Sequence, residues 1–357
     1  MDQQRQSEIL KFDQKYAKGI RHRFSRIGFS LAIMVLFAQL GALLAHALLT
    51  KYAYEITQTS WYSWTLSSVF VYFIGVPLFF LCAGKDKTAA VPQQNKMKAK
   101  DFLVMLLIAI AVMYAGNYVG SYLMAFVSSL RGQMIENPIQ VAVLNSNMWV
   151  NVVATVILAP VLEELVFRKL MIDRLGGFGE KTVMVFSALM FALYHCNFYQ
   201  FFYAFGLGLL MAYVYLRTGK VWYTILLHMI INFFGSILSA LLLRNLDQEL
   251  LYEFLEIASD TQRVQAMMED TEAYAAFIER FLPALPGFFA YSAYSTAFLG
   301  LAIAGGILFL ARMRKFVFRQ APFELPRERV GYTIYFSPGV IVAIFSTLAL
   351  SLILILA

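Results

Sequence analysis

Long apolar runs, broken by short polar segments, recur along the whole of this chain. A run of about 20 apolar residues forms a helix about 30 Å long, which matches the hydrocarbon thickness of a membrane. We therefore predict an all-α fold, a polytopic transmembrane helical bundle of about nine spans, at about 27–49, 61–83, 102–130, 148–172, 182–198, 200–217, 221–243, 287–311 and 338–357. The fifth and sixth are the weakest as separate spans, because the turn between them, near 197–200, joins two short runs.

Basic residues fall between these runs in an alternating pattern. With a cytoplasmic N-terminus, 24 of the 29 Lys and Arg lie on the inner side, in segments 1–26, 84–101, 168–181, 217–220 and 312–329. The outer side holds only Lys51, Arg131, Arg244, Arg263 and Arg280. This positive-inside bias predicts a cytoplasmic N-terminus and an outer C-terminus. No small-residue cleavage site follows a short apolar core, so we expect the first span to be an uncleaved anchor.

One acidic insert interrupts the pattern on the outer side. Residues 244–286 carry nine Asp or Glu and three Arg, with apolar residues at helical intervals. The spacing predicts one or two amphipathic helices. Two roles stay open for them: a solvated connector, or a cap that controls the access of substrate.

Composition excludes several classes of protein. Soluble domains carry about 25% charged residues, whereas this chain is 14% charged and 60% hydrophobic. Its net charge of +7 is spread between the spans and forms no nucleic-acid patch, so the expected partner is the lipid bilayer. Cys82 and Cys196 lie in or beside apolar runs and indicate neither a disulfide framework nor a thiolate metal site.

The ionisable residues Glu163, Glu164 and Arg168 stand within the fourth span. An ionised side chain at bilayer depth costs roughly 2.5–3.5 kcal/mol, so such residues usually face a protein interior and have a function. Glu164 and Arg168 are four residues apart and share a helix face, which predicts an ion pair. Glu163 is rotated by about 100° and lacks a local partner, so it is the candidate proton acceptor. Pro160 predicts a kink that would give water room beside it.

Two later spans carry imidazoles, each with a companion one turn away. His195 follows Phe191 by four residues, and His228 precedes Asn232 by four. A rise of about 1.5 Å per residue puts these groups and Glu163 about 10–20 Å from the cytoplasmic ends of their spans. We therefore expect Glu163, His195, His228 and Asn232 to meet in one chamber, where they could activate water and stabilise an oxyanion.

Each of these residues also has a structural interpretation. A single membrane Glu–Arg pair, or a single membrane His, is often no more than a contact between helices. His46 in the first span is expected to be such a case, and His22 lies among basic residues outside the membrane. The conjunction of a Glu-Glu pair with two such histidines in separate spans favours chemistry.

At these residues the chain resembles the CPBP family of intramembrane proteases, also called the CAAX-protease, bacteriocin-processing or Abi family. The family pattern of EExxxR, FxxxH and HxxxN/D reads here as Glu163 to Arg168, Phe191 to His195 and His228 to Asn232. The flanking Ala-Pro, Thr-Gly and Trp also agree, and the resemblance covers about residues 148–236. Lys169 departs from the Gly common there, which we expect to affect packing at the helix end.

The resemblance implies an endopeptidase acting on a membrane-associated protein or peptide. It implies that Glu163 and His195 activate water, that His228 and Asn232 stabilise the oxyanion, and that the chain sits in a bacterial plasma membrane. We expect no metal, although zinc held by Glu163, His195 and His228 stays open. With the motifs placed, the chain divides into a basic segment 1–26, N-terminal transmembrane helices 27–130, a protease core 148–243, the acidic insert 244–286 and C-terminal transmembrane helices 287–357.

Two other functions use the same residues. A transporter could use them as a proton or ion relay, but neither an inverted repeat nor a paired set of broken helices is visible. An inactive immunity scaffold that kept the fold is the other alternative, and the intact motifs count against it.

Overall fold

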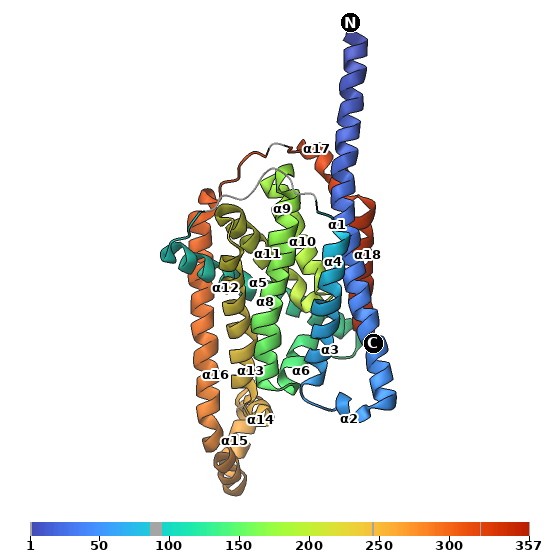
Figure 1. Ribbon diagram of the computed structural model, residues 1–357. Helices are drawn as coiled ribbons and strands as arrows, with labels where there is room; N and C mark the ends of the chain where they lie inside the picture. Colours follow the sequence, from blue (N-terminus) through green and yellow to red (C-terminus); the bar gives the residue numbers. More distant parts are fainter. Residues whose placement is uncertain (1, 86–94, 245, 322, 357) are drawn as a thin grey trace.

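The chain folds into a bundle of long helices that run roughly parallel to one axis (Figure 1). The computed structural model describes residues 2–85, 95–244, 246–321 and 323–356. These residues are 87% helical and include no strand. The all-α, polytopic fold predicted from the apolar runs is therefore confirmed.

Within the described residues, eight helical stretches are long and apolar enough to cross a membrane. They are Gln14–Tyr52, Tyr62–Cys82, Ala99–Arg131, Met148–Phe178, Phe198–Thr218, Val221–Arg244, Thr271–Lys315 and Pro338–Leu356. Each coincides with one of the predicted spans. The first lies within a single helix, α1 (Asp2–Tyr52), so the polar segment 1–26 continues into the first span from Asp2 onward.

The remaining predicted span, 182–198, is helix α10 (Glu180–Tyr194), which has only 15 residues. At 1.5 Å per residue it is about 22 Å long, short of the hydrocarbon thickness. It ends because Cys196 adopts a positive φ of 48° and the Asn197 side chain caps the next helix, α11 (Phe198–Thr218). An ion pair between Glu180 and Arg217 joins the start of α10 to the end of α11, so the two helices form an antiparallel hairpin.

Polar segments that the charge pattern assigns to one side do gather at one end of the bundle. Besides Glu180–Arg217, Asp101 at the start of α5 (Ala99–Arg131) lies 3.7 Å from Arg312 at the end of α16 (Thr271–Arg312). The backbone amide of Asn95 donates to the Thr218 carbonyl at 3.0 Å. Half of the predicted inner segment 84–101, residues 86–94, lies outside the described residues.

The first and last described spans pack against each other through glycine. Helix α18 (Pro338–Leu356) lies along α1 in Figure 1. A Cβ on Gly28 would lie 2.4 Å from the Gly339 carbonyl carbon, so only glycine permits this approach. The Gly339 amide donates to the Ser25 hydroxyl at 2.9 Å. His46 also lies on α1, and its Nδ1 is 2.7 Å from the hydroxyl of Tyr62 on another helix, α3 (Tyr62–Ser68). This confirms the contact between helices that was predicted for His46.

The acidic insert contains the predicted amphipathic helices. These are α14 (Gln248–Ala258) and α15 (Thr261–Glu269), after which the first turns of α16 complete the segment. Each begins at an aspartate whose side chain accepts from backbone amides of the first turn: Asp247, Asp260 and Asp270. They project beyond the bundle at the end opposite the N-terminus (Figure 1).

Candidate active site

The fourth span is a continuous helix with two π-helical segments. These are η2 (Val152–Leu158) and η3 (Leu165–Leu170), on either side of α8 (Ala159–Glu164). The sequence predicts a kink at Pro160. In a π-helix the Thr155 carbonyl would accept from residue 160, but proline has no amide hydrogen. The Asn232 side chain supplies the donor instead, at 2.8 Å.

Glu164 and Arg168 form the expected ion pair on the inner face of this span. Arg168 Nη1 lies 3.0 Å from Glu164 Oε1, and both side chains are fully buried. The guanidinium also lies 4.3 Å over the ring of Phe191, on α10, and its Nη2 is 3.7 Å from the sulfur of Met211, on α11. Three elements therefore enclose this charge, which offsets part of its desolvation.

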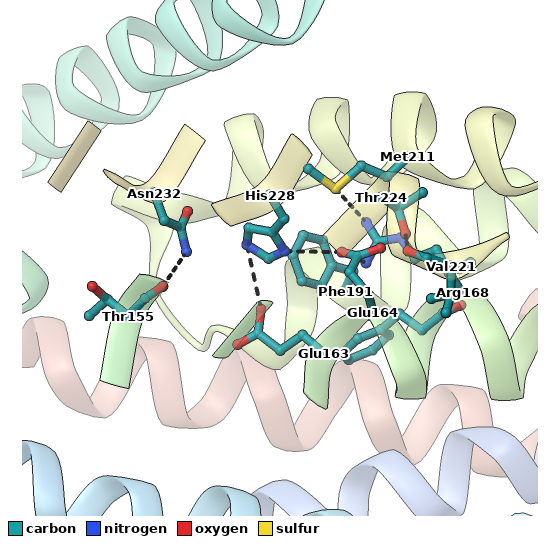
Figure 2. Close-up of polar contacts among 12 residues, drawn as sticks. Thr155, Glu163, Glu164, Arg168, Phe191, Met211, Val221, Thr224, His228 and Asn232 are labelled. Atoms are coloured by element: carbon teal, nitrogen blue, oxygen red, sulfur yellow. Dashed lines mark hydrogen bonds and ion pairs between the residues drawn. The ribbon is translucent and has the colours of Figure 1, made fainter. Parts of the chain in front are cut away.

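His228 stands between the two glutamates of the first motif. This residue lies on α12 (Val221–Asn232) and is 5% exposed. Its Nδ1 is 3.0 Å from Glu164 Oε1, and its Nε2 is 3.9 Å from Glu163 Oε2 (Figure 2). Because Glu164 is held as a carboxylate by Arg168, it accepts from Nδ1–H and leaves Nε2 directed at Glu163. The sequence reasoning gave Glu164 only its contact with Arg168 and missed this second one.

Glu163 is also held from the second span, which the motifs do not cover. Tyr72, in η1 (Val69–Gly75), donates its hydroxyl to Glu163 Oε1 at 3.0 Å. Glu163 is 6% exposed. Sequence reasoning missed Tyr72; its signal is a hydroxyl in an apolar run, VFVYFIG, with a proline five residues later.

His195 reaches the site through Phe191. Its Nδ1 donates to the Phe191 carbonyl at 2.8 Å, which leaves Nε2 as the acceptor of a neutral ring. The Phe191 ring meets His195 edge to face at 4.9 Å between centroids and His228 at 5.8 Å. In the described part of the chain no hydrogen bond joins His195 to Glu163.

Asn232 lies one turn beyond His228, on the side away from Glu164 (Figure 2). One hydrogen of its amide is used by the Thr155 carbonyl. A carboxamide has two N–H donors, so a second remains for another acceptor. The structure thus groups four predicted residues around His228, namely Glu163, Glu164, Arg168 and Phe191, and sets His195 and Asn232 at the edges of this group.

The alternative of a zinc site is not matched by the arrangement of donors. Among the residues that the structure describes, no three His, Cys, Asp or Glu side chains are grouped so that they could hold a metal ion. The Nδ1 atoms of His195 and His228 are both engaged, with the Phe191 carbonyl and with Glu164, and their Nε2 atoms are left for other partners.

Lys169, the departure from the family pattern, has a local partner. Its Nζ lies 2.8 Å from Asp173 Oδ2, and the Tyr215 hydroxyl donates to Asp173 Oδ1 at 2.7 Å. This small polar cluster ties the end of the fourth span to α11. It shares no hydrogen bond with Glu163 or His228.

Comparison with known proteins gives two matches. Residues 145–234 match the family model described as type II CAAX prenyl endopeptidase Rce1-like. Over 98 residues the chain is 30% identical to a Bacillus subtilis (strain 168) protein named "Putative membrane peptidase YdiL", a stretch that covers 26% of this chain and 39% of that protein. No solved structure matches the chain.

The matched segment contains all three motifs and every residue grouped around His228. It begins just before the fourth span and ends just after Asn232. The resemblance to the CPBP family is therefore confirmed over residues 145–234, which are similar to the Rce1-like family model.

Proposed function

We propose that this protein is an intramembrane endopeptidase, similar to CAAX proteases, that hydrolyses a peptide bond of a membrane-associated protein or peptide. The observation that carries the proposal is a buried carboxylate, Glu163, placed between the Tyr72 hydroxyl and the His228 ring. The matched family and the membrane-peptidase relative support the same activity. The Bacillus relative supports a location in a bacterial plasma membrane.

Glu163 acts as the general base in this proposal. It takes a proton from a water molecule as the water oxygen attacks the peptide carbonyl carbon. The C–N bond then breaks, and the same proton passes to the leaving nitrogen. His195 presents an unprotonated Nε2, so it accepts a hydrogen bond from the attacking water and orients it.

His228 and Asn232 stabilise the oxyanion in this scheme. With Nδ1–H donated to Glu164, this role requires the doubly protonated His228 ring, whose Nε2–H lies on the side of Glu163 where the carbonyl would react. Asn232 offers the N–H that Thr155 does not use. Donors fixed before the reaction lower its barrier most, because they need no reorganisation when charge develops. The Glu164–Arg168 pair keeps His228 in place through Nδ1.

The experiment that tests the proposal is cleavage by the purified protein in lipid nanodiscs. Membrane peptides, including a farnesylated CAAX peptide and its unmodified counterpart, are incubated with wild type and with Glu163→Gln, and the products are identified by mass spectrometry. Glu256→Gln is the matched control, because Glu256 is an exposed glutamate of the acidic insert. We expect wild type and the control to cleave and Glu163→Gln not to. Wild-type turnover by Glu163→Gln would contradict the assigned base, and absence of cleavage by wild type would contradict the function.

A further inference from the structure

The second span contributes one side chain to the proposed site from outside the matched segment. Tyr72 lies 73 residues before position 145, where the family match begins. Its hydroxyl reaches Glu163 Oε1 at 3.0 Å, while Glu163 Oε2 faces His228. Both oxygens of the carboxylate are therefore directed by neighbours on different helices.

Two features of the second span place Tyr72 at this depth. Helix η1 packs against α1. A Cβ on Gly41 of α1 would lie 2.6 Å from the ring of Phe70 of η1, so glycine at position 41 permits this close packing. Pro77 lies five residues after Tyr72 and has no amide hydrogen, so the Tyr72 carbonyl has no i+5 amide to accept from. This proline follows the π-helical turn η1 closely. The fourth span shows the same spacing between Thr155 and Pro160. π-Helical turns are frequent at functional sites.

Tyr72 has the chemistry of an orienting group. A carboxylate only accepts, so the tyrosine hydroxyl is the donor, and a hydrogen bond to an ionised group is among the stronger ones in proteins. A Glu side chain has several rotatable bonds, and a general base must be aligned with the proton that it removes. Fixing Oε1 fixes the direction in which Oε2 presents its lone pairs to water.

We propose that Tyr72 is a positioning residue for Glu163, so that the active site extends from the family segment to the second span. This inference rests on the proposed peptidase function. It assigns to the second span a part in turnover that is separate from anchoring the bundle. The hydroxyl, not the aromatic ring, carries the role.

The test is Tyr72→Phe, which keeps the ring and removes the hydroxyl. We expect kcat to fall roughly 10-fold to 100-fold, because one hydrogen bond to a charged group is lost. KM should stay within about 2-fold, because the group acts on the base and not on bound substrate. Tyr215→Phe is the matched control: it removes another tyrosine hydroxyl that donates to a carboxylate, that of Asp173, outside the site.

Infrared difference spectra give a readout that does not depend on turnover. The Glu163 carboxylate band is identified as the band lost in Glu163→Gln. This band should shift in Tyr72→Phe and stay in place in Tyr215→Phe. If Tyr72→Phe does not fold, 3,5-difluorotyrosine at position 72 retains the volume and strengthens the donor, and the same band must then shift.

The outcomes separate this inference from the function on which it rests. If wild type cleaves and Glu163→Gln does not, the function stands. A wild-type kcat and an unshifted carboxylate band in Tyr72→Phe would then overturn the role of Tyr72 alone. A loss that appears only in KM would make Tyr72 a substrate contact and would also overturn it. If wild type shows no cleavage, the unshifted or shifted band still decides whether Tyr72 orients Glu163.

Discussion

Replacing Glu164 by alanine should destabilise the protein more than any change of an exposed charge. Arg168 is fully buried and would lose its only carboxylate within ion-pair distance among the described residues. Removing one partner of a buried ion pair costs about 3–5 kcal/mol, because the other charge stays buried without compensation. The Phe191 ring and the Met211 sulfur remain beside Arg168, but neither carries a negative charge.

This cost converts into a shift of the melting temperature. The entropy of unfolding is about 2.1 cal/mol/K per residue, which for 357 residues gives about 0.75 kcal/mol/K. The expected decrease of Tm is therefore about 4–7 °C. Thermal unfolding in detergent, followed by loss of the monodisperse peak in size-exclusion chromatography, measures it.

Two further variants make the measurement specific. Glu256→Ala breaks the exposed ion pair between Glu256, whose side chain is 64% exposed, and Arg263, whose side chain is 52% exposed. It should lower Tm by about 1 °C or less. The double change Glu164→Ala with Arg168→Met removes both buried charges and should recover most of the lost stability. A Tm of Glu164→Ala equal to wild type, or a double variant less stable than the single one, would refute the reasoning.

The remaining predictions concern the proposed chemistry. Glu163→Gln, His195→Ala and His228→Ala should each abolish cleavage in the nanodisc assay while the protein still folds; turnover by any of them would exclude that residue from an essential role. Asn232→Leu should lower kcat by roughly 100-fold, the effect of losing one oxyanion donor, and an unchanged kcat would mean that its bond to Thr155 is only structural. Treatment with 1,10-phenanthroline should leave the cleavage rate unchanged, and inhibition reversed by zinc would show that a metal takes part.

Much of the fold could be predicted because membrane spans are encoded by local composition. Each apolar run of sufficient length became a helix, and the spacing of basic residues predicted which ends gather together. Helix α10 differs in length: a turn near 197–200 was predicted, but the helix ends earlier, at Tyr194, because of the positive φ of Cys196, which composition does not signal. The continuous α1 is a second difference, because polar side chains at 1–26 say nothing about whether the backbone stays helical.

Inside the site, the local pairing was predictable and the cross-helix pairing was not. Four-residue spacing predicted the contact of Glu164 with Arg168, and the structure has it. The choice of Glu164 as the partner of His228 Nδ1 depends on how α12 is rotated against α8, which no spacing within one helix records. Tyr72 was hidden for a similar reason: a tyrosine in an apolar run looks like an ordinary lipid-facing aromatic.

The glycine contact between α1 and α18 has a consequence for biogenesis. Gly339 is translated 311 residues after Gly28, so the surface of the first span around Gly28 is made long before its partner exists. Packing of α18 against α1 is therefore a late step in assembly. A ribosome stalled before residue 338 would leave a nascent chain that already has the family-matched segment 145–234 but whose first helix lacks this partner.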